Sequence, residues 1–96
     1  MIGIVAELEI QDGKQADFET IGKDLMAKVK ANEPGCTTYQ LYKKKGSDTT
    51  YIFMEQYSSK EALAAHGQTD YFKAAQPGIG ACLAGAPSIQ MFDIVE

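Results

Sequence analysis

The stretch from Glu55 to Lys73 contains the residues best suited to chemistry in this sequence. It holds His66, the only histidine of the chain, with Glu55 at its start and Tyr57 two residues later. An imidazole transfers protons near neutral pH, and a carboxylate can orient it. These residue types indicate an acid/base pair of His66 and Glu55, assisted by Tyr39 or Tyr57, around a small aromatic ligand.

A purely structural interpretation uses the same residues. His66 lies at the end of a predicted helix, where an imidazole also interacts favourably with the last carbonyl groups. The alternation of Tyr51, Phe53 and Tyr57 is equally typical of aromatic rings that fill a core. Residue spacing alone therefore leaves both interpretations open.

The first half of the chain changes period once. MIGIVAELEI alternates apolar residues in the manner of a strand with one buried face. After Asp12-Gly13, Phe18 begins an apolar stripe at spacings of three, four and four, which predicts a helix over about 14–31. The Pro34-Gly35 pair ends it. Two strands rich in threonine and tyrosine follow over 36–45 and 49–57, joined as a hairpin.

The second half of the chain predicts helices and a last strand. Ser58 with Glu61 has the spacing of a capping box, so a helix is expected from there to about Gly67. A further helical piece is expected after Thr69, and we expect Pro77 and the glycines beside it to kink or split that piece. The final SIQMFDIVE is a strand.

The order β-α-β-β-α-β predicts the fold class. It is the order of an α+β, ferredoxin-like domain with a four-stranded antiparallel sheet and helices on one face, and 96 residues make a single domain, 1–96. Glu55 and Tyr57 then share one face of their strand. His66 shares a helix stripe with Leu63, so it reaches the space between helix and sheet if Leu63 packs on the sheet.

The face of the sheet without helices carries apolar residues in this prediction. An uncovered apolar face requires a partner, so the sequence predicts a homodimer that packs sheet against sheet. The residues assigned to that face are Val5, Ile52, Met54, Ile89, Met91 and Val95.

Charge and composition exclude several classes of protein. The net charge of −4 argues against nucleic-acid binding, and the basic run 43–45 is expected at the end of a hairpin. One histidine and the separated Cys36 and Cys82 provide no metal set. Neither a signal peptide nor a membrane span is recognisable, which predicts a cytoplasmic protein.

Several segments resemble one family when they are taken in order. EPGCTTYQLYKKK, YIFMEQYSSKEALAAHGQTDYFKAA and GAPSIQMFDIV are similar to the antibiotic biosynthesis monooxygenase domain family, over nearly the whole chain. The matching features begin with Pro34-Gly35-Cys36 and Tyr39-x-Leu41. They continue with Glu55-x-Tyr57, Glu61-Ala62, His66 and Tyr71-Phe72.

This resemblance implies a dimeric α+β barrel with a ligand pocket between sheet and helices of each subunit. Family members include monooxygenases that oxidise quinols or phenols without metal or flavin. The implied site has His66 as base, Glu55 orienting it and tyrosine hydroxyls as donors, and it needs dioxygen and no cofactor. The residues expected to contact the aromatic substrate are Leu8, Tyr39, Phe53 and Phe72.

The resemblance also includes departures and alternatives. Leu8, Tyr57 and Gln76 stand where the haem-degrading branch has asparagine, tryptophan and the haem-ligating histidine. These replacements argue against haem degradation as the function. Three hypotheses stay open. They are a cofactor-free quinol or phenol monooxygenase, a non-catalytic small-molecule-binding or stress-response protein, and an isomerase that works by proton transfer.

Overall fold

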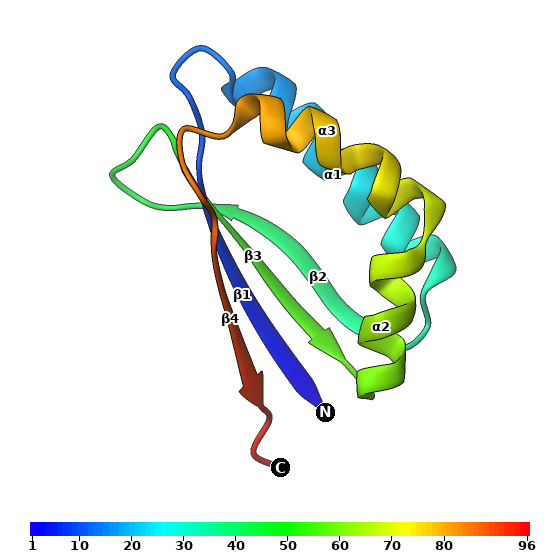
Figure 1. Cartoon of the computed structure of the whole chain (residues 1–96). Coiled ribbons are helices and arrows are strands. Elements are labelled where there is room, and N and C mark those ends of the chain that lie inside the picture. The colour runs from blue at the N-terminus through cyan, green and yellow to red at the C-terminus, as the bar shows by residue number, and fades with distance from the viewer.

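The computed structural model covers residues 1–96 and has two layers, a sheet and a layer of helices (Figure 1). The chain order confirms the expected α+β fold, with the second helical segment present as two helices. The elements are β1 (Ile2–Glu9), α1 (Gln15–Asn32), β2 (Cys36–Lys43), β3 (Thr50–Tyr57), α2 (Lys60–Gln68), α3 (Asp70–Cys82) and β4 (Ser88–Asp93).

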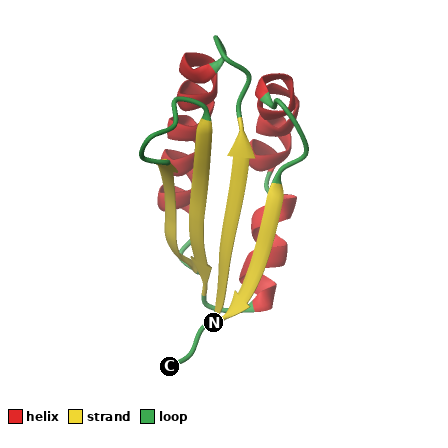
Figure 2. Cartoon of the chain, turned by 90° about the vertical axis from the view of Figure 1, so that its left-hand side faces the viewer, coloured by secondary structure: helices red, strands yellow, loops and turns green.

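The four strands form one antiparallel sheet in the order β2-β3-β1-β4. Every neighbouring pair is antiparallel, as expected for a ferredoxin-like sheet. All three helices lie on one side of it, and Figure 2 shows the other side of the sheet with the helices behind it. No helix is long and apolar enough to cross a membrane.

The core lies between the sheet and helices α1 and α3, with α1 at its centre. Phe18 on α1 is fully buried, and its ring centroid lies 4.9 Å from that of Tyr51 on β3. Leu25 and Val29 continue the same stripe, as the sequence spacing predicts. This packing fixes the face of β3 that also presents Phe53 and Glu55.

Two helix predictions need correction. Helix α2 is capped by Ser59, whose hydroxyl accepts a hydrogen bond from the Ala62 backbone N–H at 3.1 Å, and the predicted Ser58 cap is wrong. Helix α3 is not split at Pro77. It runs on to Cys82 because its C-terminal half is buried on the core side, and Gly78 allows close packing against Ile21 of α1.

The prediction of which residues lie on the uncovered face is only partly correct. The strand register places Val5, Ile52 and Met54 on that outer face, as predicted. Ile89 and Met91 pair with the inward-facing Ala6 and Ile4, so they lie on the helix side of β4.

The exposure of Ile89 and Met91 explains why the sequence pattern placed them on the uncovered face. Ile89 and Met91 are 62% and 61% exposed because β4 is an edge strand, beyond the reach of the helices. Phe92, which pairs with Gly3, is the apolar residue that β4 contributes to the outer face. Val95 follows the end of β4 and belongs to neither face.

Candidate active site

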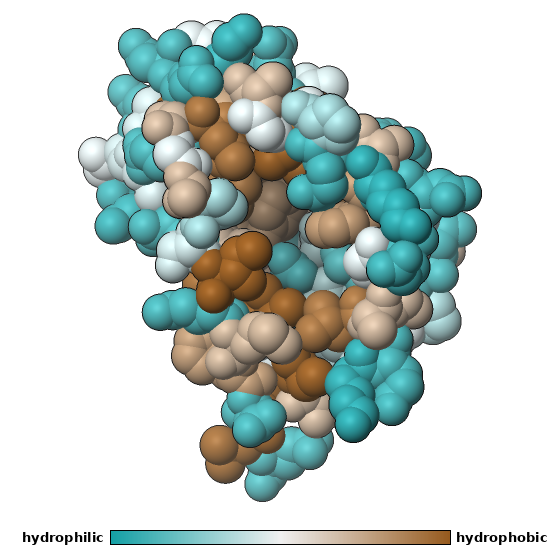
Figure 3. All heavy atoms as spheres, in the orientation of Figure 1, coloured by the Kyte–Doolittle hydropathy of each residue, from teal (hydrophilic) through white to brown (hydrophobic).

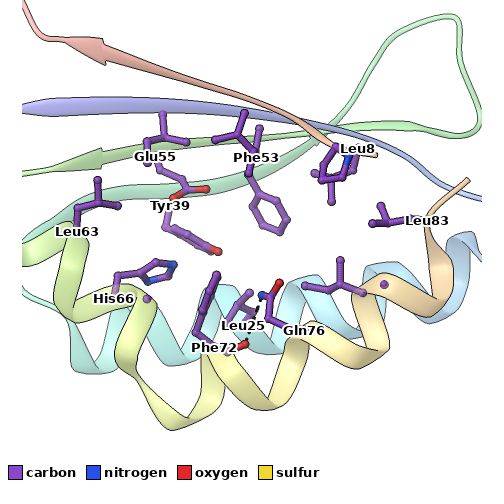
Figure 4. Close-up of a pocket in the computed structure, with 17 residues that line it drawn as sticks. Leu8, Leu25, Tyr39, Phe53, Glu55, Leu63, His66, Phe72, Gln76 and Leu83 are labelled. Atoms are coloured by element: carbon purple, nitrogen blue, oxygen red, sulfur yellow. Dashed lines mark hydrogen bonds between the residues drawn. The ribbon is translucent and has the colours of Figure 1, made fainter. Parts of the chain in front are cut away.

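A cavity of about 290 Å³ lies between the sheet and helices α2 and α3. This volume is at the lower end of the range for small-molecule sites, roughly 300–1,000 Å³. Most of its lining is apolar, and Figure 4 shows the side chains converging from both layers. The lining residues on the sheet include Leu8, Tyr39, Phe53 and Glu55, and those on the helices include Leu63, His66, Phe72 and Gln76.

His66 forms one end of this cavity. It is the last-turn residue of α2, it is 4% exposed, and three aromatic rings surround it. The ring centroids of Phe72, Tyr39 and Tyr57 lie 4.6, 5.2 and 5.5 Å from that of the imidazole. These contacts hold the imidazole in one position. A histidine that only interacts with the carbonyl groups at a helix end would not need to be held in this way.

The carboxylate that orients His66 is Glu33. His66 Nδ1 lies 3.0 Å from Glu33 Oε1 and 3.1 Å from Oε2, and the Glu33 side chain is only 11% exposed. The Tyr71 hydroxyl donates a hydrogen bond to the same carboxylate. Burial, together with this bond, raises the pKa of Tyr71 to about 12, so its hydroxyl stays a donor. The prediction that Glu55 orients His66 is therefore wrong.

Chain topology explains how Glu33 reaches His66. Glu33 lies in the connection between α1 and β2, and β2 begins beside the end of β3, where Cys36 pairs with Tyr57. Helix α2 starts only three residues after β3 ends. The end of α1 and the helix α2 therefore meet at one end of the sheet. Glu33 directly precedes the Pro34-Gly35 pair at the end of α1, and its contact with His66 was not predicted from the sequence.

Three buried side chains each present to the cavity a polar atom without a protein partner. His66 Nε2, the Tyr39 hydroxyl and Glu55 Oε2 make no hydrogen bond, and no fully enclosed side-chain nitrogen or oxygen lacks a partner. These atoms therefore border the open space of the cavity. Burial first, and then the nearby Glu55 charge, raises the pKa of Tyr39, so its hydroxyl remains protonated.

Glu55 lies on the sheet side of the cavity and is 9% exposed. Its Oε1 accepts a hydrogen bond from the Tyr57 hydroxyl at 2.6 Å, one of the partners expected for a buried carboxylate. Desolvation raises the pKa of Glu55, while the Tyr57 hydrogen bond and His66 partly oppose that rise. Glu55 is thus a second titratable group facing the same space as His66.

The structure gathers most of the predicted site residues at this cavity. Six of the seven line it, namely Leu8, Tyr39, Phe53, Glu55, His66 and Phe72. Tyr57 does not line it, because its ring is fully buried behind His66 and its hydroxyl holds Glu55. No group of three or more histidine, cysteine or acidic side chains is arranged to hold a metal ion.

The raised pKa of Glu55 gives a stability prediction for Glu55→Gln. The folded state holds the Glu55 proton more tightly than the unfolded state, whose glutamate pKa is about 4.3. The contribution of Glu55 to stability is therefore fully present below that value and is lost as pH rises towards the folded pKa. We expect the free energy of unfolding of the natural protein, relative to Glu55→Gln, to fall as pH rises from 4 to 7.

Urea unfolding at half-unit pH steps measures this difference. Glu61→Gln on the exposed side of α2 is the matched control, because it removes a solvated carboxylate from the same region. A difference between the natural protein and Glu55→Gln that stays constant, or grows, across this range would contradict the assignment.

Comparison with known proteins agrees with the fold and identifies the family. The family described as "Antibiotic biosynthesis monooxygenase" matches residues 1–78. A crystal structure of a "putative antibiotic biosynthesis monooxygenase" from Caulobacter crescentus CB15 is 53% identical, with a TM-score of 0.96. That alignment covers 99% of this chain and 90% of the other.

Two curated relatives are more distant. The "Putative monooxygenase YcnE" of Bacillus subtilis (strain 168) is 26% identical over 73 residues, which is 76% of each chain. The "Uncharacterized protein sll1783" of Synechocystis sp. is 25% identical over 99% of this chain, and the match spans 64% of its own length. The family match covers more than three quarters of the residues, and the fold agrees with it. The chain therefore belongs to the antibiotic biosynthesis monooxygenase family.

Proposed function

We propose that this protein is a monooxygenase that acts on a small quinol or phenol without a cofactor, with His66 as the base. One observation carries the proposal. Glu33 holds His66 Nδ1, while Nε2 borders an apolar cavity that is large enough for an aromatic ring. An apolar cavity of roughly 150 Å³ accepts benzene, so 290 Å³ accommodates a substituted ring.

The first step is proton transfer. A phenolic hydroxyl beside His66 gives its proton to Nε2, and the Glu33 carboxylate stabilises the imidazolium that forms. The Tyr39 hydroxyl, which has no protein partner, donates a hydrogen bond to the phenolate. Both groups are already in place before the substrate binds, so little reorganisation accompanies the reaction.

The second step uses dioxygen. A deprotonated quinol is electron-rich enough to reduce dioxygen itself, so the ring is the electron donor. One oxygen atom replaces a ring hydrogen, and the quinol is oxidised to a hydroxyquinone. The second oxygen atom leaves as water with two protons from the substrate, one of which the His66 imidazolium returns. The apolar walls formed by Leu8, Phe53 and Phe72 keep bulk water away from the charged intermediate.

One observation also favours an isomerase as a second candidate. Glu55 and His66 face the cavity from opposite layers, the sheet and α2, which suits removal of a proton on one side of a ligand and its return on the other. A non-catalytic binding protein would use the same cavity. Exchange of deuterium into a ligand without oxygen consumption would identify the isomerase.

The monooxygenase proposal predicts oxygen uptake with dihydroxynaphthalenes in metal-free and flavin-free buffer. His66→Ala should reduce kcat/KM by about 100- to 10,000-fold, the usual contribution of a positioned base. Glu33→Gln should reduce kcat more than it raises KM, since it removes the charge that stabilises the imidazolium. Oxygen-electrode kinetics on both variants, with Glu61→Gln as the control, measure these effects.

Two outcomes of that assay would contradict the proposal. Unchanged uptake in His66→Ala would remove this residue from the mechanism. No uptake across a broad quinol panel, together with thermal stabilisation of the protein by the same compounds, would favour the binding protein.

We also propose that two copies of the chain associate through their outer sheet faces. This face presents an apolar group bordered by glutamines and Glu7, and Met54 and Phe92 are 43% and 49% exposed. A stable interface needs about 1,000 Å² or more of buried surface, which a whole sheet face can supply. The apolar members of the face are Val5, Tyr42, Ile52, Met54 and Phe92.

The dimer proposal predicts a mass in solution of twice the 10.4 kDa chain at micromolar concentration. Met54→Glu places a charge at this face and should shift the mass to that of one chain. Ala74→Glu, on the exposed side of α3, controls for the added charge. Sedimentation equilibrium measures all three proteins, and a 10.4 kDa mass for the natural chain would refute the dimer.

A further inference from the structure

The cavity has a polar end and an apolar end. At the polar end, atoms without protein partners belong to the buried side chains of His66, Tyr39 and Glu55. At the other end the lining consists of Leu8, Leu83 and neighbouring apolar side chains. Figure 4 shows this separation, with His66, Tyr39 and Glu55 grouped near Leu63 and with Leu8 and Leu83 apart from them.

The cavity opens to solvent through a mouth formed by four residues. The exposed members of the lining are Gln76, Gly80, Pro87 and Ile89, and together they form the mouth between α3 and the start of β4. A Cβ atom at Gly80 would meet no heavy atom within 4 Å outside the backbone of its own helix, so there is open space on this side of the mouth. Figure 3 shows a hollow flanked by hydrophobic side chains between the sheet and the helices.

Ile89 connects the interior of the cavity to the surface. It lines the cavity and is still 62% exposed, although it lies on the inward side of β4. A single phenol ring at the His66 end occupies about half of the volume, if benzene needs roughly 150 Å³. The rest of the 290 Å³ lies along apolar walls that lead to the mouth.

We propose that the cavity binds phenols or quinols with a linear alkyl chain, with the hydroxylated ring at His66 and Tyr39 and the chain leaving through the mouth beside Ile89. This inference rests on the proposed function for the position of the ring. It extends the proposed function by specifying the substituent that the ring carries. A second copy of the chain seated over the mouth is the competing occupant, and it would block long chains.

Binding of 4-alkylphenols from methyl to heptyl tests this proposal. Isothermal titration calorimetry in anaerobic buffer measures Kd without turnover, so the result is independent of the monooxygenase assay. We expect Kd to fall about fourfold for each added methylene, as for full burial in an apolar site, and to level off when the chain reaches solvent. A Kd that is constant or rises along the series, or no binding by any member, would overturn the proposal.

Two matched pairs of variants locate the chain. Ile89→Gln should reduce the ratio of heptyl to methyl affinity by tenfold or more. Met91→Gln is its control, because Met91 has the same exposure and face but does not line the cavity. Gly80→Leu narrows the mouth and should reduce the same ratio, with Gly85→Leu in the connection before β4 as its control. Equal ratios within both pairs would place the chain elsewhere.

The two proposals can fail separately. Chain-length dependence without oxygen uptake would leave the binding site intact and refute the monooxygenase. Oxygen uptake with short quinols, together with weaker binding of long chains, would refute the alkyl channel alone.

Discussion

The buried contact between Glu33 and His66 is the interaction on which the arrangement of this site depends. An imidazole has two nitrogens, and the partner of one determines what the other can do. Glu33 lies at Nδ1, so Nε2 is the atom left at the cavity. Tyr71 holds Glu33 in turn, and the rings of Tyr39, Tyr57 and Phe72 hold the imidazole.

The fold produces this arrangement because its helices cover only one face of the sheet. Helix α1 packs closely against β2 and β3 in the core, whereas α2 and α3 leave a cavity that all four strands line. The edge strand β4 closes that cavity incompletely, which exposes Ile89. A closed end at His66 and an open mouth are thus consequences of the same layer arrangement.

Local patterns in the sequence predicted most of the fold but not the contact between Glu33 and His66. Alternation in β1 and the stripe that begins at Phe18 depend on neighbouring residues, so they could be recognised directly. Glu33 and His66 are 33 residues apart, and only the topology brings them together. Combining the strand order with the short β3–α2 connection could have found Glu33. The faces of Ile89 and Met91 were misassigned because an edge strand is exposed on both faces, so its pattern does not reveal the register.

Because His66 is the only histidine, NMR of the imidazole nitrogens tests the central claim without ambiguity. A two-bond ¹H–¹⁵N correlation spectrum of the free protein at pH 8 reports which nitrogen carries the proton. The account predicts the Nδ1–H form, with Nδ1 donating to Glu33 and Nε2 unprotonated towards the cavity. Glu33→Gln should reduce the population of that form. A proton found on Nε2 in the natural protein would contradict the account.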